Sequence, residues 1–167
     1  MKRKRLTFYY IILMLICLAP MPVLAVSEGQ KMAIVDHCES IKDSLKNVQK
    51  QDARTRVYLG GRYETILSGL IMPLNVRLIE NSLSSAELVE NQSDFAERKV
   101  RFSDNYISYQ QGLEELVSMN CREEPERFYE KLTEVRAKRN AVNKDVAEMR
   151  KLITKNIELV RGLMKEL

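Results

Sequence analysis

The stretch "FYEKLTEVRAKRNAVNKDVAEMRKLI", residues 128–153, decides the fold class of this chain. Its apolar residues recur at alternating spacings of four and three positions. A helix turns once every 3.6 residues, so this spacing gathers them into one stripe, and a stripe that persists over several heptads is typical of a coiled coil. The stretch therefore predicts a long helix whose seam consists of Phe128, Leu132, Val135, Arg139, Val142, Val146, Met149 and Ile153.

Two earlier stretches, 34–66 and 88–116, carry the same repeat. No run alternates with a period of two over more than a few residues, which disfavours sheets. Short connections between long helices make consecutive helices antiparallel. The sequence thus predicts an all-α fold, an antiparallel three-helix coiled-coil-like bundle with helices at about 31–82, 85–118 and 125–165.

Signals at the helix ends agree with this periodicity. A Ser-Ser-Ala-Glu capping box starts the second helix near Ser85. Pro125 fits the first turn of the third helix, where its missing N–H costs nothing. Gly60 and Gly61 weaken the first helix by ~1 kcal/mol each relative to alanine. Pro73 removes an internal hydrogen bond and predicts a kink nearby.

The amino terminus has the three-part layout of a secretory signal peptide. Basic residues at 2–5 precede an apolar run at 6–18, and small residues then lead to a cleavage site after Ala25. A bilayer span needs ~20 apolar residues, so cleavage of 1–25 is the leading interpretation and retention as an uncleaved anchor is the alternative. We expect 26–167 to form a helical bundle that is secreted or extracytoplasmic and associated with the cell envelope.

The basic balance of the chain comes from this amino-terminal segment. Four of the 27 basic residues lie at 2–5, and removing them leaves 23, equal to the 23 acidic residues. A nucleic-acid-binding surface needs excess positive charge to neutralise phosphates. We therefore expect no nucleic-acid partner, and a membrane contact only through 1–25 if that segment is retained.

Cys38 and Cys121 are the only cysteines after the signal segment. At 1.5 Å per helical residue, the chain from Cys38 to the first turn is about as long as the chain from that turn to Cys121. Export also favours disulfides, so we predict a Cys38–Cys121 bond. The alternative is a reactive thiol beside His37, the only histidine, but adjacent helical residues do not face each other and no third group orients them.

The segment "ARTRVYLGGRYET", 53–65, mixes arginine and tyrosine around a glycine pair. Arginine and tyrosine are enriched in interaction hot spots, and glycine lets another backbone approach. The plainer interpretation is a solvated helix with extended arginine side chains. We take this segment as the candidate partner contact, made by Arg54, Arg56, Tyr58, Arg62 and Tyr63.

Polar residues also interrupt the predicted seams. The register of the helices brings Asp52 near Arg139, and Lys99 near Glu64. Ion pairs at such positions add little stability but can fix register. We predict that Asp52 and Arg139 form a structural ion pair.

Motifs for catalysis and for cofactor or metal binding are absent from the sequence. There is no GxGxxG, GxxxxGK[ST], GxSxG or HExxH, and one histidine is too few for the usual zinc ligand sets. We therefore assign no catalytic, cofactor-binding or metal-binding residues, and we expect a protein that is not an enzyme.

The chain resembles uncharacterised exported helical proteins of reduced-genome bacteria at Cys38, "RTRV" 54–57, "RYE" 62–64, "PLN" 73–75 and "CREEPERFYEKL" 121–132. That family carries no assigned activity, so the resemblance implies an exported helical protein without naming a reaction. In size, export signal and long helices the chain is also similar to OmpH/Skp-type periplasmic chaperones. Those chaperones oligomerise through a small β-structured body, for which this sequence has no strands.

Two functions follow from these patterns. The first is a structural or interaction protein that presents a coiled-coil surface to a protein partner at the cell envelope. The second is an extracytoplasmic chaperone or holdase for unfolded clients. Self-association into a homo-oligomer is compatible with both.

Overall fold

A computed structural model describes residues 26–83 and 85–165, and the predicted signal peptide, 1–25, lies outside the described residues. The described part is all-helical and contains no strand. None of its helices combines the length and the apolar composition that crossing a bilayer requires. The elements in chain order are α2 (Glu28–Asp36), α3 (Cys38–Ile66), η1 (Leu67–Ile71), α4 (Met72–Glu80), α5 (Ala86–Ser118) and α6 (Pro125–Lys165).

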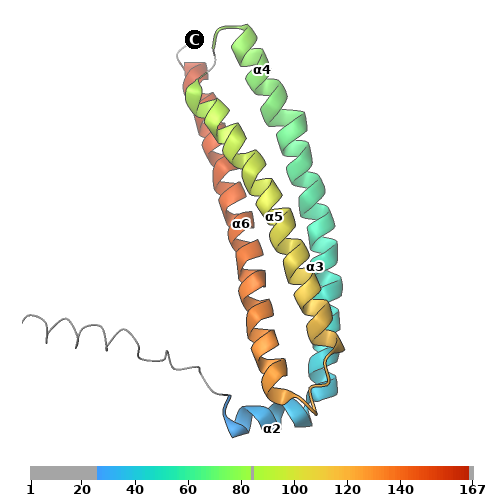
Figure 1. Cartoon of the computed structure of the whole chain (residues 1–167). Coiled ribbons are helices and arrows are strands. Elements are labelled where there is room, and N and C mark those ends of the chain that lie inside the picture. Colours follow the sequence, from blue (N-terminus) through green and yellow to red (C-terminus); the bar gives the residue numbers. More distant parts are fainter. Residues whose placement is uncertain (1–25, 84, 166–167) are drawn as a thin grey trace, which may run out of the picture.

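The long helices pack side by side in an elongated molecule (Figure 1). The chain rises through α3, η1 and α4, returns along α5 and rises again along α6, while α2 lies across the base (Figure 1). α5 and α6 pack on each other along most of their length, and α3 packs mainly on α5.

The turn after α4 is built by a Schellman motif. The N–H of Ser82 donates to the carbonyl of Ile79 at 3.0 Å, and the N–H of Leu83 donates to the carbonyl of Leu78 at 2.8 Å. Ser82 has φ 58°, the left-handed conformation that this motif demands and that glycine usually supplies. Next, the Ser85 hydroxyl accepts a hydrogen bond from the N–H of Leu88 and caps α5. The chain can therefore reverse direction within a few residues.

The first helix, predicted at about 31–82 with a kink near Pro73, has one further break that the prediction lacked. The helix begins at Glu28, and it is interrupted at His37, whose backbone (φ −106°, ψ 15°) separates α2 from α3. A second change occurs at η1, which is a π-helical turn. Gly60 and Gly61, in contrast, leave α3 unbroken.

The predicted kink near Pro73 takes the form of this π-helical turn. Pro73 has no N–H for the carbonyl of Gly69, four residues earlier, and its ring crowds that carbonyl. The N–H of Met72 bonds to the carbonyl of Leu67, five residues back, which is the π-helical pattern. The wider turn rotates α4 relative to α3, so the apolar stripe of α3 does not continue in phase.

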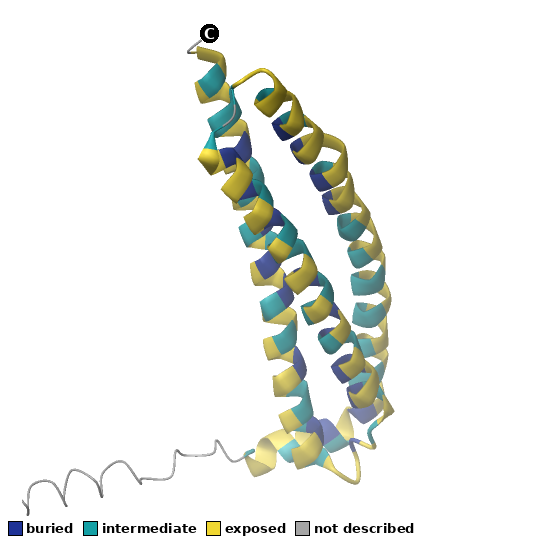
Figure 2. Cartoon of the chain, turned by 45° about the horizontal axis from the view of Figure 1, so that its top comes forward, coloured by how far each residue is buried: buried dark blue, intermediate teal, exposed yellow. Residues whose placement is uncertain are grey.

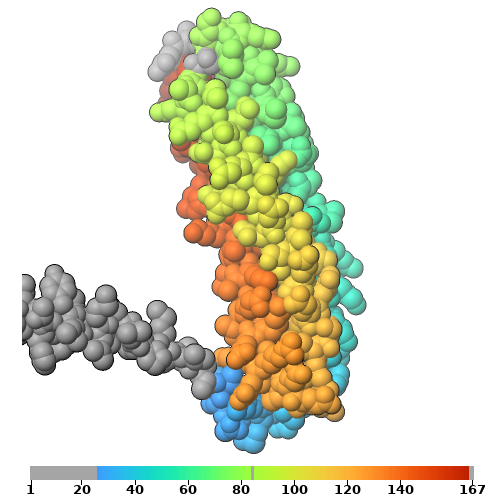
Figure 3. Space-filling view, in the orientation of Figure 1, coloured from blue at the N-terminus to red at the C-terminus, as the bar shows by residue number. Residues whose placement is uncertain are grey.

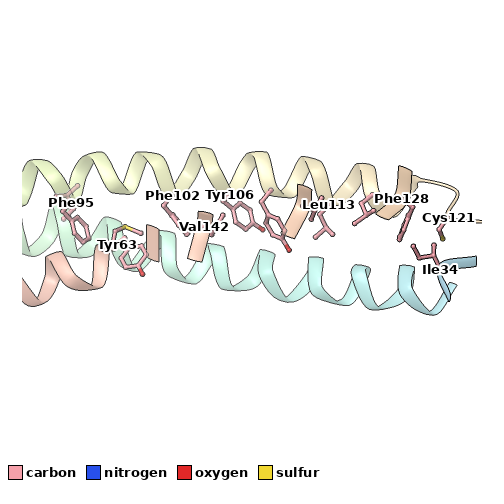
Figure 4. Packing of buried hydrophobic residues seen from close by; sticks show 14 of the residues in the cluster. Ile34, Tyr63, Phe95, Phe102, Tyr106, Leu113, Cys121, Phe128 and Val142 are labelled. Carbon is pink, nitrogen blue, oxygen red and sulfur yellow. The ribbon is translucent and has the colours of Figure 1, made fainter. Parts of the chain in front are cut away.

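The core is a single stripe of large side chains that α5 and α6 share with one face of α3 (Figures 2 and 4). Tyr63 of α3 lies edge-on to Phe95 and Phe102, with ring centroids 6.1 Å and 5.9 Å away. On α6 the buried apolar residues recur every seven positions, as the seam predicts: Phe128, Val135, Val142 and Met149.

Cys38 and Cys121 form a disulfide, with their Cα atoms 5.7 Å apart and 83 residues apart in sequence. Both residues are buried. The bond joins the first residue of α3 to the loop between α5 and α6, so it fixes the base of the molecule. It also excludes the reactive-thiol alternative in this state, because the Cys38 sulfur is already bonded.

We expect removal of this bond to destabilise the protein. The chain-entropy model assigns ~4.5 kcal/mol to closing a loop of this length, which is an upper bound for the loss. Urea unfolding of the exported protein, with and without reductant, measures the difference. A double variant, Cys38→Ala with Cys121→Ala, should match the reduced protein and be insensitive to reductant. Equal stability of the oxidised and reduced wild type would contradict this role.

Candidate functional site

A polar cluster connects the three long helices midway along the bundle. The Arg139 guanidinium of α6 donates from Nε and Nη2 to the Asp52 carboxylate of α3 at 2.9 Å and 3.0 Å. The Tyr109 hydroxyl of α5 donates to the same carboxylate at 2.7 Å. The predicted Asp52–Arg139 pair is thus present, and Tyr109 completes it. The predicted proximity of Lys99 to Glu64 is also found, as a salt bridge.

The cluster shifts the titration of its members. Burial is the main cause that raises the pKa of Tyr109, and the hydrogen bond to Asp52 adds to it. The same carboxylate raises the pKa of Arg139 through its hydrogen bond. Tyr109 is therefore held as a neutral donor and Arg139 as a cation, so the cluster orders the helices.

A cavity of about 70 Å³ adjoins the cluster. On its wall Arg56 lies over the Tyr106 ring, 5.0 Å from the ring centroid, in a cation–π contact. The volume holds only a few waters and is far below the ~300 Å³ at which ligand pockets begin. The cavity is therefore a packing feature of the bundle and too small for a substrate.

The predicted contact segment is divided between core and surface. Tyr63 is only 3% exposed, so its assignment as a surface contact is wrong: it belongs to the aromatic core. Arg56 is half-buried over Tyr106. Tyr58 is 62% exposed and accepts a hydrogen bond at 2.8 Å from Arg62, which is itself exposed. Arg54, Tyr58 and Arg62 remain as exposed residues of that segment.

Arg62 lies on the wall of an apolar groove, which we call the α3–α6 groove. It has a volume of about 570 Å³. Asn156 is 7% exposed, and its Nδ2 has no hydrogen-bond partner. Burying an unpaired amide donor is costly, so Asn156 is a point of unfavourable packing at the floor of this groove. The groove is lined by Arg62, Thr65, Ile66, Leu70, Ile71, Ile153, Asn156 and Ile157.

Sequence reasoning missed this groove because it treated the apolar residues of α3 as one stripe. The π-helical turn leaves Ile71 buried and Leu70 exposed, at the edge of the groove. Asn156 takes the next seam position of α6, seven residues after Met149, and it is buried there although it is polar. Pro73 was the available signal, since proline can induce such a turn upstream.

A second buried carboxylate was also missed. Asp145 of α6 is 1% exposed and accepts from Asn105 at 2.6 Å and from Arg98 at 3.3 Å, both on α5. Arg101 lies 4.0 Å away. A carboxylate this buried is tolerated only when it is paired and hydrogen-bonded. It fixes the register of α5 against α6.

The described residues include no group of three His, Cys, Asp or Glu side chains that could hold a metal ion. His37 is exposed at the junction of α2 and α3 and belongs to no such group. Comparison of the chain with family models, with curated proteins and with solved structures gave no match. The resemblances in sequence therefore remain predictions.

The Tyr109 cluster predicts a loss of stability at alkaline pH. The folded state holds the Tyr109 proton more tightly than the unfolded chain, whose tyrosine pKa is about 10. The stability from this proton is thus complete below pH 10 and is lost as the pH rises further. Urea unfolding from pH 8 to 11 should show a steeper fall for wild type than for Tyr109→Phe. Parallel curves would exclude the linkage.

The Asp52–Arg139 pair predicts a measurable coupling free energy. The contact is bidentate and partly shielded from water, so we expect ~1 kcal/mol, the upper end for such pairs. A double-mutant cycle with Asp52→Asn and Arg139→Gln measures it by urea unfolding. The single-contact surface pair Lys151–Glu148 serves as control, with an expected coupling below ~0.5 kcal/mol. The same value for both pairs would be evidence against a register role.

Proposed function

We propose that this chain is an exported, non-enzymatic interaction protein. Its bundle is an antiparallel three-helix coiled coil, stapled by Cys38–Cys121, that presents a helical surface to a protein partner at the cell envelope. The observation that carries the proposal is the α3–α6 groove, an open apolar surface with an unpaired buried amide at Asn156.

The shape of the groove supports a helical or extended peptide as its occupant. Ile153 and Ile157 on α6 are one helical turn apart, and so are Ile66 and Leu70 on the opposite wall. Rows with this spacing receive an amphipathic helix whose anchors recur at i, i+4 and i+7. Exposed apolar residues grouped in this way mark interaction sites more often than scattered ones do.

The polar groups of the groove define the chemistry of the partner. Arg62 and the Nδ2 of Asn156 are both hydrogen-bond donors, and Arg62 carries a positive charge. Arg150 lies near Tyr63, where it lowers the pKa of that tyrosine against the larger raising effect of burial. An apolar segment that carries a carboxylate would pair with the exposed Arg62.

The compartment is supported by the disulfide, which persists in oxidising environments outside the cytoplasm. The runner-up function, a holdase for unfolded clients, would use the same groove with little selectivity. The two functions differ in the number of proteins that the groove contacts, because a dedicated partner is one species and unfolded clients are many.

Site-specific photo-crosslinking in the producing cell tests the proposal. A photoreactive phenylalanine analogue in place of Leu70 should yield one predominant cross-linked protein. The adduct should weaken when Arg62→Glu is added, because the partner's carboxylate would then be repelled. The same analogue at Met32, an exposed residue of α2 far from the groove, is the control.

The outcomes separate the two functions. Many cross-linked proteins from position 70 would favour the holdase. No adduct at position 70, or the same adducts from positions 70 and 32, would rule out the groove as a binding surface.

A further inference from the structure

Exposed apolar side chains are concentrated on one flank of the molecule, opposite α6. Among the described residues, twelve large hydrophobic side chains are exposed, and seven of them share this flank. Scattered exposed hydrophobics are normal on a protein surface, whereas a contiguous group marks an interaction site. We call this flank the α3–α5 face. Its exposed apolar residues are Val57, Met72, Val76, Ile79, Val89, Val100 and Ile107.

Helical phase places the α5 residues on this face. Asn91, Arg98 and Asn105 bond to α6 and so mark the side of α5 that faces α6. Ser103, on the other side, lines a groove against α3 together with Lys99. Residues three and four positions from Ser103 lie on the same side of the helix. By this rule Val100, which is 56% exposed, and Ile107 lie on the side of α5 that Ser103 marks. Val89 lies on that side too, because it precedes Val100 by eleven residues, about three helical turns.

The residues of α3 and α4 follow the same logic. Val57, 71% exposed, lines the groove against α5. In α4, Asn75 donates to Gln92 of α5 at 2.8 Å, while Leu70 of η1 turns toward α6. Met72, Val76 and Ile79 are spaced at i, i+4 and i+7, so they share one side of the helix. That side lies next to Asn75 and points away from Leu70. Figure 3 shows α5 and the α3–α4 segment side by side along the molecule.

The face combines a gap with projecting side chains. A Cβ added at Gly60 or Gly61 would meet no atom within 4 Å, so the backbone there is open to an incoming side chain. The groove at this level has a volume of about 310 Å³. Val100 and Ile107 project from the neighbouring helix and are of the size that enters such a gap. The face therefore has both a gap and side chains that could fill the same gap on another such face.

We propose that the α3–α5 face binds a second copy of this chain. A two-fold axis along the groove would lay α3 of each copy over α5 of the other. The salt bridge between Glu64 and Lys99 crosses the groove, so this axis brings Glu64 of one copy level with Lys99 of the second copy. Charge thus alternates around the axis, which is the complementarity that a two-fold interface requires.

The apolar residues are in matching positions for this arrangement. Val57 precedes Glu64 by seven residues, and Ile107 follows Lys99 by eight, so both lie about 10–12 Å from the salt bridge on the same side. On the other side Val76 follows Glu64 by twelve residues and Val89 precedes Lys99 by ten, which puts both at about 15–18 Å. Val57 and Val76 therefore meet Ile107 and Val89 of the second copy.

A second copy fits this face better than an ionic partner or a membrane. The groove is lined by the salt bridge, which is already compensated, and by Arg56, which stacks on Tyr106 of the same chain. An anionic lipid surface would require clustered lysine and arginine at the edge of the apolar patch, as in interfacial helices. The α3–α6 groove lies on the other side of α3, so dimerisation and partner binding are independent.

Sedimentation equilibrium of the exported protein tests the proposal. We expect a dimer at ~100 µM that Val100→Glu or Ile107→Glu converts to a monomer, with the dissociation constant raised more than tenfold because a charge would be buried in the contact. Both side chains are exposed in the monomer, so circular dichroism should show unchanged folding. Met164→Glu, at an exposed residue of α6 away from this face, is the matched control and should dimerise like wild type.

A mixing experiment separates contacts between copies from those within one copy. Glu64→Lys and Lys99→Glu each place like charges across the axis, so each variant alone should dimerise more weakly than wild type. An equimolar mixture should form heterodimers, because every contact between copies is again between opposite charges. A monomeric wild type at 100 µM, a Val100→Glu dimer as tight as the Met164→Glu dimer, or no heterodimer in the mixture would overturn the proposal.

Discussion

The packing of α5 on α6 supports the rest of the structure. The two helices approach closely at Gly112, where an added Cβ would lie 3.2 Å from the Val135 side chain. Around that point the seam is filled by buried aromatic and aliphatic residues that repeat every heptad. α3 then docks mainly on α5, with Tyr63 held between Phe95 and Phe102. The position of α3, and with it both grooves on its flanks, thus depends on the aromatic surface that α5 presents.

Two carboxylates between helices, the buried Asp145 and the half-buried Asp52, set the register that the apolar seam leaves open. A 4-3 seam that slides by a heptad still brings apolar positions together, so the seam alone specifies the alignment only through the fit of its side chains. Asp145 can be satisfied only where Arg98 and Asn105 are both in reach, and Asp52 only beside Tyr109 and its arginine partner. A slipped register would leave a charge buried without a partner, which costs several kcal/mol. These carboxylates specify one alignment more than they add net stability.

Much of this architecture was predictable, because seams and turn residues act locally. The seam of α6, the cap at Ser85 and the disulfide end of the bundle follow from spacing alone. What could not be predicted depends on neighbours far away in sequence. Tyr63 is a core residue only because α5 offers two aromatic rings to it. The break at His37 has no signal in the periodicity either, whereas the exposure of Leu70 goes with the π-helical turn that Pro73 explains.

Both candidate surfaces have the same physical origin in the way α3 and α4 pack on the other long helices. One seam residue per turn is enough to hold α3–α4 against the other helices, so each of its flanks is left to solvent unless another chain covers it. On a solvated flank, apolar residues contribute nothing to the stability of the monomer. Yet one flank carries Val57 and Val76 beside a compensated salt bridge, and the other carries Leu70 beside the unpaired amide of Asn156. The flank with the salt bridge has the composition of a symmetric contact, and the flank with Asn156 has that of a selective contact. The two flanks are therefore suited to different occupants.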